Sequence, residues 1–254
     1  MTVQDDARER ELCRLFNLRW NREHKRDGTD AHFSVEVGGD SIEIPVEVKS
    51  TTGTSVSTAR DVGMPHIKKW RSQFWVIGYY TKSSSPDLKD SLCLTPNDIE
   101  GWVASIEKKI LPDFMIASCA ARRIEMSDLI SICGDKEHYT IGDAKLLHKK
   151  QWTAKQYKDA PDIEIEVQIK KRKVIKRAIS KDKMLALLKL RSEYISGRGA
   201  TLNNPHISKT FLNQFKGTDR MIPADTEDCG ARLRRIAIDY LMANPDHTFK
   251  IIKA

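Results

Sequence analysis

Residues 32–49 read HFSVEVGGDSIEIPVEVK, from His32 to Lys49. Apolar and polar residues alternate on both sides of Gly38-Gly39-Asp40, as they do in strands that bury one face. The glycines supply the positive-φ positions that a tight hairpin turn demands. We therefore expect a β-hairpin with strands at 32–37 and 41–49.

The second strand of this hairpin carries charged residues on one face. Because side chains alternate along a strand, Glu47 and Lys49 are neighbours on the face opposite the apolar residues. A two-residue turn at Gly38-Gly39 puts Asp30 opposite Glu47, whereas a turn at Gly39-Asp40 puts it opposite Lys49. Either register places Asp30 on the same face as the pair.

Two carboxylates on this face need a positive charge between them. Directly opposed side chains lie roughly 4.5–5.5 Å apart at Cβ, so Asp30 and Glu47 would otherwise repel each other. Mg²⁺ suits this position, since it binds through one or two carboxylates together with water and phosphate oxygens. It would polarise a phosphate and acidify a bound water, while Lys49 orients that water or stabilises charge on phosphorus. The alternative is a surface hairpin with an ordinary Glu–Lys ladder.

Asp30 followed by Glu47-Val48-Lys49, after an N-terminal helix with acidic residues, resembles the PD-(D/E)XK nuclease superfamily, specifically its type II restriction endonucleases. The resemblance covers roughly residues 8 to 80. It implies an α/β fold with a restriction-endonuclease-like core, a mixed β-sheet flanked by helices. It also implies that Asp30 and Glu47 bind Mg²⁺, that Lys49 assists hydrolysis, and that Glu11 joins from the first helix. The expected substrate is double-stranded DNA, and the expected assembly is a homodimer.

Two positions depart from the family pattern. Thr29 stands where the family commonly has proline before the aspartate. Pro45 cannot donate to a ladder, so it indicates an edge, a bulge or one-sided pairing, and a bulge would change the register argument. Acid-x-Lys alone is a weak signal, because four other places match it, but none lies on a strand after a hairpin partner with an aspartate; they begin at Glu23, Asp87, Glu107 and Asp143.

Further elements surround the hairpin. Apolar spacing predicts a helix over 4–24 and a buried strand over 73–81, with a short helical segment between the hairpin and that strand. The block from His66 to Tyr79 also resembles the helix and strand that follow the active site in restriction enzymes, and core packing is favoured over base stacking for its aromatic residues. Thr95-Pro96 begins a capped helix. We expect a nuclease core over 1–140 and a basic, helix-rich recognition region over 141–254.

Positive charge is concentrated in that second region. The chain has a formal net charge of +8, and residues 145–181 hold twelve Lys or Arg against four Asp or Glu. Such a field favours a polyanion, although a solvated charged helix is the alternative. Residues 181–216 have a loose helix-turn-helix pattern, for which a capped amphipathic helix on the core is the alternative. The candidate DNA-binding residues are Lys170, Lys171, Arg172, Lys173, Arg198, Asn203, Asn204 and Lys209.

The remaining composition excludes other classes of protein. No apolar run approaches the roughly 20 residues of a membrane-spanning helix, and the N-terminus lacks a signal-peptide pattern, so we expect a cytoplasmic protein without a membrane partner. The five cysteines are scattered, form no CxxC pair and are interpreted as reduced thiols. The open alternatives to a restriction enzyme are a repair, junction-resolving or modification-dependent nuclease and a non-catalytic DNA-binding protein.

Overall fold

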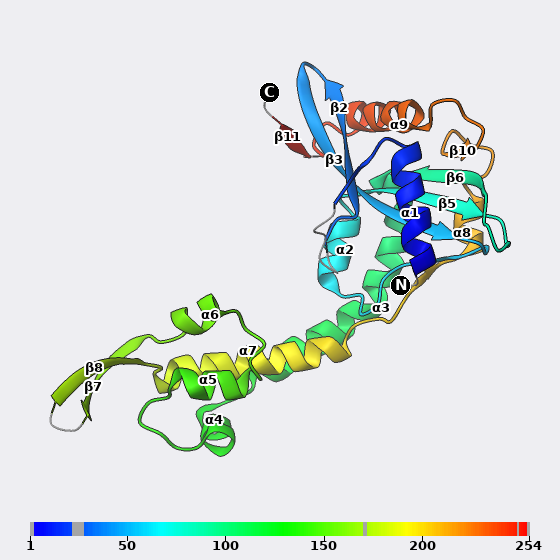
Figure 1. Ribbon diagram of the computed structural model, residues 1–254. Coiled ribbons are helices and arrows are strands. Elements are labelled where there is room, and N and C mark those ends of the chain that lie inside the picture. The colour runs from blue at the N-terminus through cyan, green and yellow to red at the C-terminus, as the bar shows by residue number, and fades with distance from the viewer. Residues whose placement is uncertain (1–2, 22–27, 170–171, 248, 253–254) are drawn as a thin grey trace. The chain divides into compact units, whose positions relative to one another are not determined.

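The computed structural model describes residues 3–21, 28–169, 172–247 and 249–252, and the chain forms two compact units (Figure 1). The first unit comprises 1–110 and 202–254, and the second comprises 111–201. The expected division into 1–140 and 141–254 therefore has to be corrected. The last fifty residues return to the first unit because they supply strands to its sheet.

Within the described residues, the first unit is built on a seven-stranded sheet. The sheet is mixed, as expected for this part of the chain, whereas the number of strands was not predicted. Strand β3 pairs with β2 in antiparallel and with β5 in parallel orientation, and the C-terminal strand β11 also pairs with β3. The sheet order β1-β2-β3-β5-β6-β10 places β3 in the interior. The strands are β1 (Arg19–Trp20), β2 (Ala31–Val37), β3 (Asp40–Thr51), β5 (Phe74–Tyr80), β6 (Leu88–Leu94), β10 (Met221–Pro223) and β11 (Lys250–Ile252).

The β2–β3 hairpin turns at Gly38 and Gly39, which have φ values of +63° and +91°. Val37 pairs with Asp40, so the turn consists of Gly38 and Gly39. This is the first of the two expected registers. When it is continued beyond the last pair, position 30 lies opposite position 47. The register runs through Pro45 without a bulge. On the other edge of β3, β11 pairs with residues 41–43 and β5 with residues 46–51, so Pro45 lies between these two partners. Its missing N–H costs no ladder bond there, which confirms one-sided pairing.

Helices cover both faces of this sheet. Helices α1 (Val3–Leu15) and α9 (Cys229–Ala243) pack on the face that carries the apolar residues of β3, including Ile44, Val46 and Val48. Helix α1 is shorter than expected and is followed by Asn17 at φ +50°, a left-handed conformation that asparagine tolerates. The opposite face is covered by α2 (Met64–Trp70) and by the start of α3 (Pro96–Arg122).

An aromatic cluster holds α2 and α3 to the sheet. The ring centroids of Trp70 and Trp75 lie 5.6 Å apart, and Trp102 lies 5.2 Å from the first and 5.9 Å from the second. Trp70 and Trp75 are fully buried, which confirms core packing for them. Three short elements complete the described part of the first unit: β4 (Val56–Ser57) pairs with β9 (His206–Ile207), and α8 (Lys209–Asn213) follows β9.

The second unit has its own core and is less helical than the sequence predicted. Leu129, Tyr139, Ile179, Met184 and Leu188 are buried together in it. Its unpredicted feature is an antiparallel hairpin of two strands, and its elements are α4 (Met126–Cys133), α5 (Ile141–Leu147), α6 (Ala154–Asp159), β7 (Ile163–Ile169), β8 (Arg172–Ala178) and α7 (Lys181–Gly199).

The helix-turn-helix interpretation of 181–216 is wrong. Helix α7 belongs to the second unit and α8 to the first, with β9 between them in the sequence. A helix-turn-helix requires both helices in one packed motif.

Among the residues that the structure describes, no helix is long and apolar enough to cross a membrane.

Candidate active site

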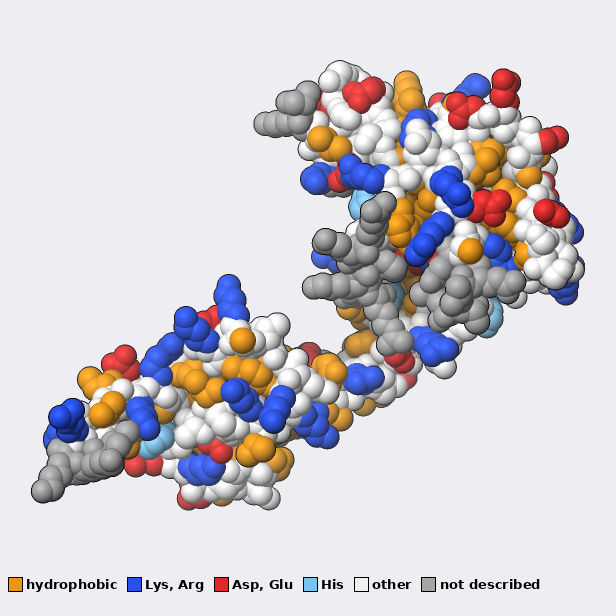
Figure 2. Space-filling model, in the orientation of Figure 1, with side chains coloured by type: hydrophobic (Ala, Val, Ile, Leu, Met, Phe, Trp, Pro, Cys, Tyr) orange, Lys and Arg blue, Asp and Glu red, His pale blue; other side chains and the backbone are white. Residues whose placement is uncertain are grey.

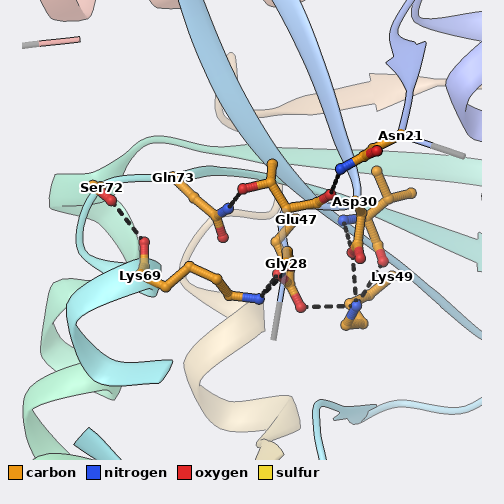
Figure 3. A network of polar contacts seen from close by, with 10 residues as sticks. Asn21, Gly28, Asp30, Glu47, Lys49, Lys69, Ser72 and Gln73 are labelled. Carbon is orange, nitrogen blue, oxygen red and sulfur yellow. Dashed lines mark hydrogen bonds and ion pairs between the residues drawn. The ribbon is translucent and has the colours of Figure 1, made fainter. Parts of the chain in front are cut away.

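Asp30, Glu47 and Lys49 meet where β2 begins and β3 runs into the middle of the sheet (Figure 3). Asp30 directly precedes β2, and its Oδ2 accepts hydrogen bonds from the backbone N–H of Val48 at 3.0 Å and from Lys49 Nζ at 3.1 Å. The expected trio is thus assembled by the hairpin. The carboxylates of Asp30 and Glu47 are both buried.

The Lys49 ammonium is surrounded by three oxygen atoms. Its Nζ lies 2.9 Å from Glu47 Oε1, 3.1 Å from Asp30 Oδ2 and 2.9 Å from the main-chain oxygen of Val48. The side chain of Lys49 is 12% exposed, so water screens these contacts weakly. The positive charge that two neighbouring carboxylates need is therefore supplied in this structure by Lys49 itself.

A second lysine, Lys69 of α2, completes the network. Its Nζ lies 3.0 Å from Glu47 Oε2 and donates to the carbonyl of Gly28 at 3.1 Å. Beside it, Gln73 Nε2 donates to Thr29 Oγ1 at 2.8 Å, which ties the start of β5 to the residue preceding Asp30. The sequence placed Lys69 on a helix after the hairpin, but no spacing rule indicated that it reaches Glu47.

Burial and charge act against each other on this network. Burial raises the pKa of Glu47, but the neighbouring ammonium groups of Lys49 and Lys69 outweigh it, and the net pKa lies below the ordinary value. Burial lowers the pKa of Lys49, but the carboxylates of Glu47, Asp30 and Glu9 outweigh it, and the net pKa lies well above the ordinary value. Glu47 and Lys49 are therefore both charged at neutral pH.

The acidic residue of α1 that acts on this site is Glu9, and not the expected Glu11. Glu9 is buried, and its charge adds to those of Glu47 and Asp30 in raising the pKa of Lys49 against burial. Glu11 is exposed and its Oε2 accepts a hydrogen bond from the hydroxyl of Tyr80 at 3.2 Å. The signal was available in the sequence, because Glu9 precedes buried Leu12 and Cys13 by three and four residues and so shares their helix face.

The donor atoms fit a hard divalent cation on one condition. Two carboxylate oxygens and one carbonyl oxygen converge on a single point, and this is the oxygen-only set that Mg²⁺ prefers. The Lys49 ammonium lies at that point, so it would have to leave before a cation could bind. Among the described residues, no group of three or more His, Cys, Asp or Glu side chains could hold a metal ion. The candidate set accordingly includes the main chain.

The expected DNA-binding residues fall on both units. Arg172, Lys173 and Arg198 lie exposed on the second unit, while Lys170 and Lys171 lie outside the described residues. Asn203, Asn204 and Lys209 belong to the first unit. Asn204 has φ +49° and its N–H donates to the carbonyl of Ala59 at 3.0 Å, so the structure gives it a role in a turn.

The residues after Lys49 also form a turn. Thr51 Oγ1 donates to the carbonyl of Ser55 at 2.9 Å and accepts from the N–H of Gly53 at 3.0 Å. These local bonds account for the hydroxyl of Thr51.

Compared with known proteins, the chain matches no family model, no curated protein and no solved structure.

Proposed function

We propose that this protein is a Mg²⁺-dependent endodeoxyribonuclease whose active site is Asp30, Glu47 and Lys49. The observation that carries the proposal is the convergence of Asp30 Oδ2, Glu47 Oε1 and the Val48 carbonyl on one point. The proposal extends the resemblance to PD-(D/E)XK nucleases, with the mixed sheet of the first unit as a restriction-endonuclease-like core. It includes sequence-specific cutting of double-stranded DNA by a homodimer, as type II restriction enzymes do.

Each residue has a definite task in this proposal. Asp30 and Glu47 would hold Mg²⁺, and the bound ion would supply polarisation of the scissile phosphate and a lower pKa for a bound water. The backbone N–H of Val48 keeps Asp30 Oδ2 directed at the site. Lys69 orients Glu47 through an ion pair with its second carboxylate oxygen, Oε2. Lys49 turns its ammonium to the attacking water or to a phosphate oxygen, where its charge offsets the negative charge that develops during the reaction.

The test uses isosteric variants of the carboxylates. Asp30→Asn and Glu47→Gln should each reduce cleavage of plasmid or phage DNA in Mg²⁺ by at least a hundredfold while leaving DNA binding in EDTA intact. Glu43→Gln is the matched control, because Glu43 is also a buried carboxylate of β3 with cationic partners, Arg19 and Lys250. Cleavage by either site variant within tenfold of the wild-type rate would reject the assignment. Discrete fragments from unmodified DNA would support sequence-specific cutting.

One observation favours a second candidate, a DNA-binding protein without catalysis. Lys49 and Lys69 balance the charges of Asp30 and Glu47, so these four side chains also form a complete structural network without a metal. On this alternative, wild-type protein cuts no DNA with Mg²⁺ or Mn²⁺, and Glu47→Gln lowers the free energy of unfolding without changing DNA affinity.

A further inference from the structure

The β7–β8 hairpin of the second unit is a free-standing ribbon. Its strands pair over seven positions, from Ile163 with Ala178 to Ile169 with Arg172, and within the described residues it is a separate two-stranded sheet (Figure 1). Six of the seven residues of β8 are exposed. Packing against the rest of the second unit therefore does not explain which side chains occupy the exposed positions of this ribbon.

The two faces of the ribbon differ in character. Because alternate residues of a strand share a face, Ile163, Ile165 and Val167 lie together on one side, where they are half-buried. Their β8 neighbours on that side, Arg172, Val174 and Lys176, are exposed. The other side is exposed and polar, with one exception: Ile175, which is 69% exposed. This outward face consists of Glu164, Glu166, Gln168, Lys173, Ile175 and Arg177.

The base of the ribbon is anchored, and its outer part is available to a ligand. Arg177 donates to the carbonyls of Pro161 at 2.8 Å and Lys158 at 3.3 Å, so its guanidinium is occupied by the main chain. Lys173 lies 2.7 Å from Glu166, but both side chains are more than half exposed. Such exposed ion pairs are weak because water screens both charges, so a phosphate or a base edge could replace the glutamate as partner of Lys173.

Charge favours a polyanion as the partner of the second unit as a whole, and the outward face of the ribbon itself balances Lys173 and Arg177 against Glu164 and Glu166. The hairpin segment 163–178 holds six Lys or Arg against two Glu. The second unit as a whole carries 19 Lys and Arg against 12 Asp and Glu, whereas the first carries 24 against 23, so nearly all of the net charge of +8 belongs to the second unit. Figure 2 shows blue side chains spread over this unit. A phosphate backbone gains from such a field through counterion release.

The shape of the ribbon fits one groove of the double helix. The major groove of B-DNA is about 12 Å wide and admits a two-stranded ribbon, whereas the minor groove is about half that width. The outward residues are also of the types that read base edges: Lys pairs with guanine, Gln with adenine, and an apolar side chain packs on the thymine methyl group. Lys173, Gln168 and Ile175 supply one of each.

We propose that the β7–β8 ribbon enters the major groove of duplex DNA and contacts bases through Gln168, Lys173 and Ile175. This inference rests on the proposed function in one respect: it takes duplex DNA as the bound polymer. The ribbon would then recognise the substrate that the Asp30–Glu47–Lys49 site cleaves.

The test compares two double variants of the full chain by fluorescence anisotropy with duplex DNA in EDTA. Lys173→Ala with Ile175→Ala should weaken binding at least tenfold. Lys155→Ala with Ile132→Ala is the matched control, because it removes the same charge and the same apolar surface from exposed positions of the same unit. All four side chains are exposed, and circular dichroism checks that both variants fold. Equal affinities for the two double variants would overturn the proposal.

Competition and substrate choice give independent outcomes. Methyl green, a major-groove ligand, should compete with the wild-type protein for DNA, and netropsin, a minor-groove ligand, should not. Competition by netropsin and not by methyl green would overturn the placement of the ribbon in the major groove. Tighter binding to single-stranded RNA than to duplex DNA would overturn the choice of partner. Because binding is measured without metal, a wild-type protein that binds through the ribbon but never cuts DNA would refute only the catalytic proposal.

Discussion

Replacing Lys49 by methionine should tighten the binding of a divalent cation at this site about a hundredfold. The ammonium lies at the point where Asp30 Oδ2, Glu47 Oε1 and the Val48 carbonyl converge, so a cation has to displace it. Displacement breaks contacts with two carboxylates, and each charge-assisted contact contributes about 1.5 kcal/mol. Their sum of about 3 kcal/mol corresponds to slightly more than a factor of a hundred in the dissociation constant.

The assay is isothermal titration calorimetry with Mn²⁺ in the absence of DNA. Lys69→Met is the first control, because Lys69 contacts Glu47 Oε2 and the Gly28 carbonyl, which are not among the three converging oxygens, so a smaller gain in affinity is expected. Lys89→Met, at an exposed position of β6, should leave the affinity unchanged. If Lys49→Met binds Mn²⁺ no more tightly than wild type, the ammonium does not compete with the cation and the reasoning is refuted. The same variant should still lose DNA cleavage, because its water-orienting group is gone.

Three further predictions concern the surroundings of the site. Glu9→Gln should slow DNA cleavage at least tenfold in a plasmid assay, and Glu11→Gln should keep the cleavage rate within twofold of wild type. Equal effects of the two variants would contradict the choice of Glu9 over Glu11. Gly78→Ala should lower the free energy of unfolding in urea by about 1–3 kcal/mol, since an added Cβ would lie 2.8 Å from a methyl carbon of Leu12; unchanged stability would mean that α1 shifts freely. Because the pKa of Glu47 is lower in the folded protein than in the unfolded chain, its charge stabilises the fold above the unfolded value of about 4.3, and this contribution disappears as pH falls through the folded value. Urea titrations should therefore show the stability gap between wild type and Glu47→Gln closing below pH 4, and a constant gap would contradict this.

The hairpin and its register could be predicted because they depend on local rules. A two-residue turn fixes the parity of every cross-strand pair, and Gly38-Gly39 was one of only two places for that turn. Even the anomaly at Pro45 was informative, since one of its three interpretations, one-sided pairing, is what the structure contains. The placement of position 30 opposite position 47 follows from these facts alone.

What the sequence did not predict depends on longer-range packing. Lys69 reaches Glu47 only because β5 pairs in parallel with β3, which brings α2 back over the site. Glu11 was chosen on the resemblance, although the helix face that Glu9 shares with Leu12 and Cys13 could have indicated Glu9. The return of the chain after Thr201 depends on β10 and β11, strands of three residues each that carry no alternating pattern long enough to recognise.

The division of the chain at Ile110 and Thr201 has a consequence for engineering. A Cβ added at Gly197 would lie 3.7 Å from the ring of Phe114, so the incoming and outgoing segments of the second unit run close together. Near neighbours of this kind can be joined by a short Gly-Ser bridge in place of residues 111–201. Excision of residues 111–201 would leave the proposed Asp30–Glu47–Lys49 site on a scaffold of about 160 residues, into which another folded domain could be inserted at the same two points.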